Sequence, residues 1–427
     1  MMFVWNYYGE KSVYMKAIIL AAGMGQRLEP LTETRPKCLI QVMGKSFLWY
    51  VIDTLKKSGF KDKDIGVVVG YKKEMVVQFA QIYGFKLNFI EQKEQLGTGH
   101  AIQLCQKFTK NDDFIVVMGD NLYSAKDLKK ICKKDKFSYV AGYKHKHPER
   151  YGVLVMDKNK LEKIVEKPRE FVGDFINTGL YKFTPEIYNV LKKVVKTERG
   201  EIEITDAISM LCKVNKMKSV GITDYWLDFG YPWEIFRVND FLLDKAKEYR
   251  KGTISDKAEL VGKVIVEEGT EIRFGSHIVG PVYIGKNCEI GPNCFIESYT
   301  SISNNVHIGA ACEVHNSLIM NDTNIPHHNY VGDSIIGAHC TLGSGTKVET
   351  ERNDQVTITM NIRGKMVDSY RKKIGVMTGD HVKTGVNVSI MPGVKIGSNA
   401  MIGPNVVVDK DVPAGKAVFL RQSVELR

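Results

Sequence analysis

The 427-residue sequence has no apolar run near the ~18–20 residues that a membrane-spanning helix needs. Residues 1–14 have neither the basic start nor the apolar stretch of a secretory signal peptide. We therefore expect a cytoplasmic protein that does not enter membranes. Because Met15 directly precedes the first apolar run, we interpret residues 1–14 as an extension upstream of the first domain.

The cysteines lack the spacing of a redox or metal site. Eight are present, but none forms a CxxC pair and no His/Cys cluster has zinc-site spacing. In a chain without an export signal, they are predicted to be reduced and mostly buried thiols.

An excess of one charge occurs only in the first part of the chain. The formal net charge is +11, whereas residues 251–427 contain 18 basic and 18 acidic residues. The lysines of the first part are scattered and form no basic stripe interleaved with aromatic residues, which argues against a nucleic-acid partner. Small anionic substrates or a lysine-rich surface account for the charge better.

Residues 15–248 alternate short apolar runs with amphipathic stretches. Helices are predicted at 47–58 and 73–83. Strands are predicted at 17–21, 65–69, 87–90, 114–118, 139–143, 152–156 and 179–183. The alternation is typical of βαβ units, so we predict an α/β domain with a Rossmann-like, mixed and mostly parallel sheet.

From residue 249 onward a period of six replaces the helical pattern. An aliphatic residue stands at every sixth position from Ile254 to Val314, the register slips near Ser317, and residues 349–376 interrupt the repeat. Six residues make one short strand and a turn, and three such units make one triangular coil of a parallel β-helix. We predict this fold for residues 249–427, with the aliphatic residues inside.

Apolar residues also occur between the inward positions. Val279, Val282 and Phe295 are predicted to lie on flat outer faces of the β-helix, where they would support a homotrimer. Glycine and asparagine are predicted to supply the positive φ angles of the coil corners. The repeat resembles the left-handed hexapeptide β-helix of acyltransferases.

A glycine loop follows the first predicted strand, in the run Leu20-Ala-Ala-Gly23-Met-Gly25-Gln-Arg27-Leu28. Glycine lets backbone N–H groups approach a phosphate closely. The loop is neither a dinucleotide fingerprint, because Leu28 replaces the third glycine, nor a P-loop, because no GK[ST] follows. With Arg27 and the later Lys37, it predicts a site for phosphates.

Further motifs follow in order along the chain. They are Gln92-Lys-Glu-Gln95-Leu-Gly97-Thr98-Gly-His-Ala101, Gly119-Asp120-Asn121, Arg150-Tyr-Gly152, Val165-Glu166-Lys167-Pro168, Asn177-Thr-Gly179, Glu203-Ile-Thr-Asp206 and Trp226-Leu-Asp228-Phe-Gly230. Together with the glycine loop they resemble the sugar-1-phosphate nucleotidylyltransferases. The resemblance is strongest to the archaeal-type two-domain enzymes related to bifunctional N-acetylglucosamine-1-phosphate uridylyltransferase/glucosamine-1-phosphate N-acetyltransferase.

The resemblance implies a role for each motif in transfer from UTP, or dTTP, to a sugar 1-phosphate. Asp120 and Asp228 would hold Mg²⁺, a hard cation that takes one or two carboxylates together with substrate phosphates. Arg27 would bind the leaving pyrophosphate and Lys37 the reacting phosphate. The remaining implied substrate contacts are Gly23 and Gly25 to phosphates, Gln92, Gly97 and Thr98 to the base, and Gly152, Glu166, Lys167 and Asn177 to the sugar phosphate.

The β-helix contains a second set of residues. The segment Ile325-Pro-His327-His328-Asn329-Tyr330 resembles an acetyltransferase site that uses acetyl-CoA, with His327 as base and Tyr330 and Lys373 as substrate contacts. A histidine suits deprotonation of an amino sugar near neutral pH. The sequence departs from the family at Thr350, where an asparagine is expected, and Glu349 and Glu351 flank that position.

Other assignments stay open at this stage. Within the enzyme class they are a glucose-1-phosphate uridylyl- or thymidylyltransferase and a mannose-1-phosphate guanylyltransferase, with a purely structural β-helix. Outside it, a non-catalytic regulatory homologue has the same two-part build, but Arg27, Lys37, Asp120 and Asp228 are all retained here.

Overall fold

The computed structural model describes residues 15–423 except 159 and 199, and residue 425. The predicted extension, residues 1–14, lies outside the described residues. The chain divides into two compact units, the first formed by residues up to Met24 and Phe47–Asp228, the second by Gly25–Ser46 and Phe229–Arg427. These units differ from the predicted sequence domains, because residues 25–46 and 229–248 pack with the β-helix, and the domain limits stay a prediction.

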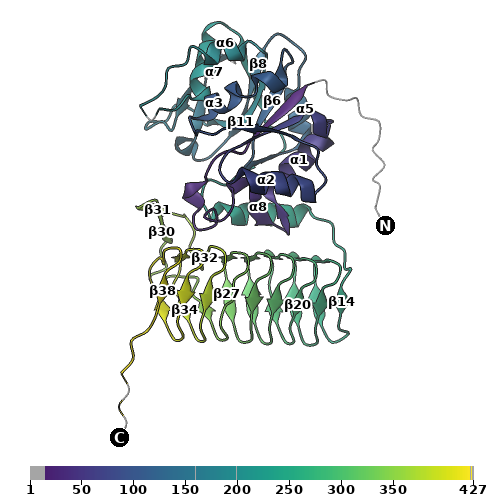
Figure 1. Cartoon of the computed structure of the whole chain (residues 1–427), viewed down its shortest axis with the longest axis vertical. Coiled ribbons are helices and arrows are strands. Elements are labelled where there is room, and N and C mark those ends of the chain that lie inside the picture. The colour runs from purple at the N-terminus through teal and green to yellow at the C-terminus, as the bar shows by residue number, and fades with distance from the viewer. Residues whose placement is uncertain (1–14, 159, 199, 424, 426–427) are drawn as a thin grey trace. The chain divides into compact units, whose positions relative to one another are not determined.

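The first unit is built on a nine-stranded mixed sheet (Figure 1). Its strands are β1 (Lys16–Leu20), β4 (Ile65–Val69), β5 (Asn88–Glu91), β6 (Phe114–Met118), β8 (Ser138–Lys144), β9 (Gly152–Asp157), β10 (Lys160–Glu166), β11 (Phe175–Phe183) and β12 (Met217–Gly221). Strand β1 lies between β4 and β6 and is parallel to both. The antiparallel pairs gather around β11, which joins β6, β8 and β9.

Helices and a small ribbon complete this unit. The helices are α1 (Phe47–Lys57), α2 (Lys73–Ile82), α3 (Thr98–Gln103), α4 (Gln106–Thr109), α5 (Ala125–Ile131), α6 (Ile187–Leu191) and α7 (Ile204–Lys213), with 3-10 turns η3 (Asp62–Asp64) and η4 (Pro148–Arg150). Strands β7 (Asn121–Tyr123) and β13 (Trp226–Asp228) form an antiparallel ribbon.

The predicted α/β fold is confirmed. All seven predicted strands and both predicted helices are present, most with their ends moved by a residue or two, although β11 begins at Phe175 rather than Gly179. Strands β10 and β12 were not predicted. Strand β10 pairs only at the sheet edge, and its exposed positions are occupied by charged residues such as Glu162 and Lys163, so it lacks the apolar run of a buried strand.

The second unit begins with the segment 25–46, which is mostly turns. It contains the 3-10 turns η1 (Gln26–Leu28) and η2 (Lys37–Leu39) and the short strands β2 (Gln41–Val42) and β3 (Lys45–Ser46). Helix α8 (Glu234–Lys245) precedes the β-helix and packs against it. Its buried Asn239 donates to the Tyr299 carbonyl at 2.7 Å and accepts from Ser301 Oγ at 2.5 Å.

The coils of the β-helix stack in a row (Figure 1). Its first face contains β14 (Thr253–Ile254), β17 (Glu271–Ile272), β20 (Glu289–Ile290), β23 (His307–Ile308), β26 (Asn324–Ile325), β33 (Lys383–Thr384), β36 (Met401–Ile402) and β38 (Ala417–Val418). Its second contains β15 (Glu259–Val261), β18 (His277–Val279), β21 (Phe295–Ile296), β24 (Glu313–His315), β27 (Tyr330–Gly332), β29 (Lys347–Val348), β34 (Ser389–Ile390) and β37 (Val407–Val408). Its third contains β16 (Val264–Val266), β19 (Val282–Ile284), β22 (Thr300–Ile302), β25 (Leu318–Ile319), β28 (Ile335–Ile336), β32 (Met377–Thr378) and β35 (Lys395–Ile396).

The predicted repeat and its interruption are confirmed. Asn287 donates to Asn305, 18 residues on, whereas Asn305 donates to Asp322, 17 residues on, so the coils become a residue shorter at the predicted slip. The interrupting segment forms a hairpin of β30 (Thr359–Ile362) and β31 (Lys365–Asp368). Every pair between strands of the three faces is parallel.

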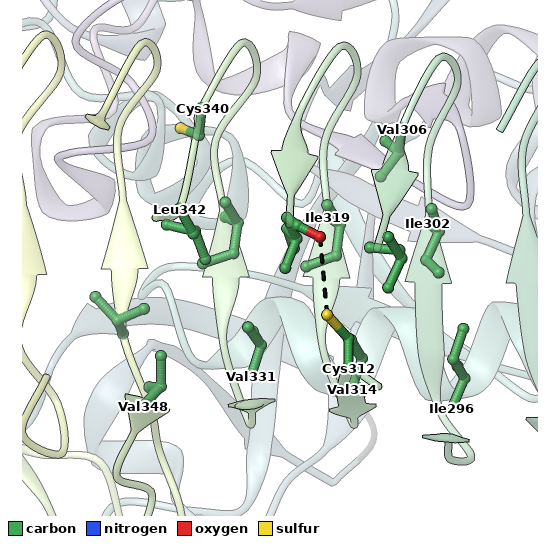
Figure 2. Packing of buried hydrophobic residues seen from close by; sticks show 14 of the residues in the cluster. Ile296, Ile302, Val306, Cys312, Val314, Ile319, Val331, Cys340, Leu342 and Val348 are labelled. Carbon is green, nitrogen blue, oxygen red and sulfur yellow. Dashed lines mark hydrogen bonds between the residues drawn. The ribbon is translucent and has the colours of Figure 1, made fainter. Parts of the chain in front are cut away.

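A continuous column of aliphatic side chains fills the β-helix (Figure 2). Ile290, Ile296, Ile302 and Ile308 are fully buried, as the six-residue period predicts. The prediction for Val282 is wrong: it is fully buried in the same column, because β19 directs both Val282 and Ile284 inward. Val279 and Phe295 are partly exposed.

The corners of the coils require residues with positive φ angles. Asn287 and Asn293 adopt φ of 54° and 58°, as predicted, but Tyr299 and His328 also adopt positive φ at corners.

The eight cysteines are free thiols, and all except Cys132 are buried. Among the described residues, no helix combines the length and apolarity required to cross a membrane.

Candidate functional site

The β7–β13 ribbon holds the two predicted metal-binding carboxylates. Asp120 directly precedes β7, and Asn121 of β7 pairs with Asp228 of β13. Burial raises the pKa of the Tyr123 hydroxyl on the same ribbon, and the charges of both carboxylates raise it further. Tyr151 adds a weak hydrogen bond to Asp228 Oδ1 at 3.4 Å.

This pair fits magnesium better than a transition metal. Within the described part of the chain, no group of three or more His, Cys, Asp and Glu side chains could hold a metal ion. Mg²⁺ usually retains waters and takes one or two carboxylates plus substrate phosphates, so Asp120 and Asp228 are a sufficient protein contribution.

The ribbon is fixed by one backbone carbonyl that no sequence motif indicated. The oxygen of Thr178 on β11 accepts from Asn121 Nδ2 at 2.7 Å, Tyr123 Oη at 2.7 Å and Trp226 Nε1 at 3.2 Å. Donors from both strands therefore converge on a single buried atom. The Asn-Thr-Gly motif supplies this oxygen as well as the Asn177 side chain.

The glycine loop and Asp120 leave the sheet at the same edge. Leu20 of β1 pairs with Met118 of β6, and both strands end there in parallel. Gly119 N donates to the Leu20 carbonyl at 2.9 Å. Gly23 has open space where a side chain would stand. Binding sites of open α/β sheets lie at the carboxyl ends of the strands, so this edge is the expected position.

The predicted sugar contacts are brought together by β9, β10 and β11. Gly152 pairs with Glu166, and a Cβ on Gly152 would come within 2.8 Å of Glu166 Oε2. Asn177 lies beside them, its Nδ2 donating to Tyr181 Oη at 2.8 Å. Lys167 follows β10 and is exposed, with its backbone N–H on the Tyr151 carbonyl at 3.0 Å.

The predicted base-reading loop is held by its own polar groups. Gln92 is 4 % exposed, and its Nε2 lies 3.2 Å from the Gly97 carbonyl and 3.1 Å from His100 Nδ1. Gly97 precedes α3 with φ of 93°, and a Cβ there would meet the Ile202 carbonyl at 2.7 Å. Thr98 Oγ1 accepts from Ile204 N at 3.3 Å. Position 97 therefore requires a glycine, both for its positive φ and for lack of space for a side chain.

Arg27 and Lys37 belong to the second unit, on η1 and η2. Gly25 precedes η1 with φ of 68°, and a Cβ there would stand 2.9 Å from Lys37 Cβ. Arg27 Cζ lies 5.4 Å from the Tyr231 ring centre, and Lys37 Nζ lies 4.9 Å from that of Phe229. A cation within ~6 Å of an aromatic ring centre is attracted to it. The segment after Asp228 thus supplies aromatic support for both cations.

A hollow of the β-helix, about 600 Å³ in volume, contains some of the predicted acetyltransferase residues. Tyr330, Lys373 and Thr350 line it together with Glu349 and Glu351. Lys373 Nζ binds Glu351 at 2.6 Å, and this carboxylate raises the pKa of the lysine. The two glutamates therefore face the hollow, and one of them neutralises the predicted phosphate contact.

His327 does not lie in that hollow. It is exposed and lines a second one of about 360 Å³, with His307, His328 and Gly309. The structure thus brings Tyr330, Lys373 and Thr350 together within one chain and places the predicted base apart from them.

Sequence reasoning missed a histidine beside Tyr330. His315 Nε2 lies 2.6 Å from Tyr330 Oη, and its Nδ1 lies 3.7 Å from Asp333 Oδ2. Asp333 is buried and also accepts from Asn316 at 2.6 Å. The only available signal was that His315 stands one residue beyond the inward Val314 and therefore points outward.

Helix α8 carries a further carboxylate, Asp240, which interacts with Arg371. Asp240 Oδ1 is buried and accepts no hydrogen bond from the described residues. Burial raises the pKa of Asp240 to about 6, and Arg371 acts against this rise. Arg371 Cζ lies 4.9 Å from the Phe236 ring centre, and its Nη2 lies 3.8 Å from Asp333 Oδ1.

Comparison with known proteins identifies the class. The nucleotidyl transferase family matches residues 16–245, more than half of the chain, and the chain belongs to this family. The C-terminal domain of the GMPPB family matches residues 278–383, and the bacterial transferase hexapeptide repeat matches residues 375–410.

Individual relatives extend over nearly the whole chain. It is 42% identical to a bifunctional sugar-1-phosphate nucleotidylyltransferase/acetyltransferase of Sulfurisphaera tokodaii, over 89% of this chain and 93% of that protein. It is 41% identical to the bifunctional protein GlmU of Methanocaldococcus jannaschii, over 97% and 99%. A Bacillus anthracis crystal structure, described as a glucose-1-phosphate thymidylyltransferase, matches 55% of this chain and 98% of that one, with a TM-score of 0.50 and 27% identity.

The raised pKa of Asp240 predicts a pH-dependent gain in stability for Asp240→Asn. The folded protein retains a proton that the unfolded chain releases between the ordinary pKa of 3.8 and about 6. Asp240 therefore destabilises the folded state increasingly as the pH rises through this window. The difference in melting temperature, variant minus wild type, should grow from pH 4.5 to pH 7 in thermal unfolding.

The exposed Asp256 provides the control, because Asp256→Asn removes a carboxylate from the surface of the same β-helix. A difference for Asp240→Asn that stays constant across the pH range would contradict this interpretation.

Proposed function

We propose that the protein transfers a uridylyl group from UTP to N-acetylglucosamine 1-phosphate, releasing pyrophosphate and forming UDP-N-acetylglucosamine. The observation that carries this is the common sheet edge at which the glycine loop and the Asp120–Asp228 pair lie. Bifunctional GlmU proteins from methanogenic archaea, similar over most of their length, support the choice of UTP and an amino sugar.

The reaction requires positioning and charge neutralisation rather than a strong base. An anionic oxygen of the sugar phosphate attacks the α-phosphorus of the nucleotide, one P–O bond forms, and the bond to pyrophosphate breaks. Asp120 and Asp228 would hold Mg²⁺, which supplies positive charge to the phosphates when bound. Arg27 binds the leaving pyrophosphate, and Lys37 binds the phosphate at the reacting centre.

The remaining contacts orient the two substrates. Lys167 neutralises the sugar phosphate, while Glu166 and Asn177 accept and donate hydrogen bonds to sugar hydroxyls or the acetamido group. Gln92, Gly97 and Thr98 read the pyrimidine edge, and Gly23 and Gly25 present backbone N–H groups to phosphate. Thymine differs from uracil by one methyl group, which changes little of the edge that such a loop would read, so dTTP is the second nucleotide. A Streptomyces griseus glucose-1-phosphate thymidylyltransferase, 29% identical over 78% of this chain, supports that alternative.

Replacing Asp120 tests the proposal. Asp120→Ala removes one of two metal-binding carboxylates, and we expect at least a ~100-fold loss of turnover with little change in melting temperature. Pyrophosphate release is measured with UTP, dTTP, CTP and GTP against four sugar 1-phosphates. Asp157→Asn, at the exposed end of β9, is the matched control.

Near-full activity of Asp120→Ala would contradict the metal assignment. Absence of pyrophosphate release by the wild-type chain with every substrate pair would instead favour a non-catalytic homologue. Preference for dTTP with glucose 1-phosphate would favour the thymidylyltransferase alternative.

We further propose that the β-helix acetylates an amino-sugar 1-phosphate with acetyl-CoA as co-substrate. His327 takes a proton from the sugar ammonium, the amine attacks the thioester carbonyl, a C–N bond forms, and the C–S bond breaks to release the CoA thiol. Tyr330 and Lys373 contact the substrate. Because Glu351 already neutralises Lys373, binding of a sugar phosphate must compete with this ion pair.

Substitution of each of the two neighbouring histidines in turn distinguishes the proposed base, His327, from a residue that only forms a corner of the coil, His328. His327→Ala should reduce release of free CoA thiol at least ~100-fold, because general base catalysis contributes about 10²–10⁴-fold. His328→Ala changes an adjacent exposed histidine and should retain activity. Glucosamine 1-phosphate and galactosamine 1-phosphate are tested in turn. Activity that survives His327→Ala would contradict the proposed base, and no activity with either sugar would make the β-helix a scaffold.

We also propose that the β-helix assembles as a homotrimer. Its outer surface exposes apolar residues: Val261, at the end of β15, and Phe274, in the turn after β17, are 44% and 54% exposed. A neighbouring copy could also complete a site whose predicted residues lie in two hollows of one chain. Sedimentation at micromolar concentration should give a trimer, and a monomer would contradict the proposal.

A further inference from the structure

One corner of the β-helix binds the segment that carries Lys37. Within the second unit, the Asp380 carboxylate accepts from Thr34 Oγ1 at 2.5 Å and forms an ion pair with the Arg35 guanidinium. Its other oxygen accepts from Ala338 N at 2.8 Å, one coil earlier. The Arg35 and Asp380 side chains are only 10% and 9% exposed. Because both side chains are enclosed, the ion pair has a fixed geometry, whereas an ion pair exposed to water could rearrange.

The neighbouring coil adds a second attachment. Ser398 Oγ accepts from Asp380 N at 3.1 Å, and Ser398 N donates to Glu33 Oε2 at 2.6 Å. Three consecutive residues, Glu33, Thr34 and Arg35, are thereby bound to the corner. Arg35 Nη1 also lies 3.2 Å from the buried Met320 sulfur.

Only Pro36 separates the attached residues from Lys37, the lysine that is proposed to bind phosphate. Consecutive Cα atoms are about 3.8 Å apart, so Arg35 and Lys37 are within about 7.6 Å of each other along the chain. Thr32, on the other side of the attachment, donates to the Gly25 carbonyl at 3.0 Å. Gly25 in turn packs against Lys37. The attachment thus lies inside the turn that Gly25 and Lys37 close.

Net stability is a poor explanation for such a pair. Buried ion pairs often contribute no more than apolar residues of the same size, because both charges lose their hydration. A fixed geometry is their better-supported use. Arg35 lowers the pKa of Asp380 against the effect of burial, which keeps the carboxylate charged and the contact in place.

We propose that Asp380 is a positioning residue for nucleotidyl transfer: from a corner of the β-helix it fixes residues 33–35, and through them Lys37 at the reacting phosphate. This proposal rests on the proposed function. Asp380 does not touch substrate in this scheme and acts only through Thr34 and Arg35. The β-helix then contributes to the chemistry assigned to the glycine loop.

The test uses the full-length chain and compares two carboxylate-to-amide changes on the β-helix. Asp380→Asn weakens the attachment, whereas Asp411→Asn alters a carboxylate that binds Lys395 and not the segment 25–46. Steady-state pyrophosphate release is measured well below the melting temperature of each variant. Because small displacements of a reacting group can cost up to about 100-fold, we expect a ~10-fold fall in kcat for Asp380→Asn, a smaller change in the KM for sugar 1-phosphate, and no change for Asp411→Asn.

Two further variants distinguish the positioning role from a general loss of structure. Thr34→Val preserves side-chain shape, removes only the hydroxyl contact, and should lower kcat ~3-fold with an unchanged melting temperature. The double variant Arg35→Met/Asp380→Asn should be no slower than the slower single variant, because both changes break the same contact. A purely structural role would make the losses add and follow the melting temperature.

The outcomes separate the two proposals. Wild-type turnover with an unaffected kcat in Asp380→Asn and Thr34→Val contradicts the positioning role alone. Equal losses in Asp380→Asn and Asp411→Asn also contradict it. A wild-type chain that releases no pyrophosphate with any substrate pair contradicts the proposed function and, with it, this role.

Discussion

The stacking of parallel coils is the constraint on which the second unit depends. Each short strand pairs only with the strands above and below it, and its aliphatic residue must meet the one in the next coil. A change in chain length inside a strand would displace every later side chain. Extra residues are therefore confined to the interruption, where the β30–β31 hairpin leaves the stack and the next coil continues its pairing through Lys347 and Ser389.

The first unit holds two carboxylates, Asp120 and Asp228, that are 108 residues apart in the sequence. The sheet fixes the first at the end of β6, and a three-residue ribbon fixes the second. The Thr178 carbonyl binds donors from both strands of this ribbon. Because these donors are buried, loss of the common acceptor would leave them unpaired at a cost of about 1–3 kcal/mol each. The proposed metal-binding pair is thus supported by an atom of the main chain.

Much of this arrangement was readable in the sequence, for identifiable reasons. The inward positions, such as Ile290 and Ile308, were predicted because an aliphatic residue recurs at every sixth position. Val282 was assigned to the wrong face because the repeat also buries the residue two positions before the inward one, as at Val264, Val306 and Val388. Strand β10 was missed because one side of it faces solvent and bears charges.

The contacts that could not be predicted join residues far apart in the sequence. Arg35 and Asp380 are separated by 345 positions, and neither lies in a repeat position that indicates a partner. The Thr178 oxygen belongs to the main chain, so no residue type marks it. His315 and Tyr330 meet because β24 pairs with β27, where Gly332 opposite His315 has no side chain in the space that the His315 ring occupies.

The buried thiols give the β-helix a built-in set of chemical probes. Cys288, Cys294, Cys312 and Cys340 line its interior at different points along the stack, and burial raises the pKa of Cys288 and Cys340 to about 11. A thiol reagent reacts with the thiolate, so these positions react only when their coil opens to solvent. The modification rate of each cysteine therefore measures how often its part of the stack opens locally to solvent, without any introduced label.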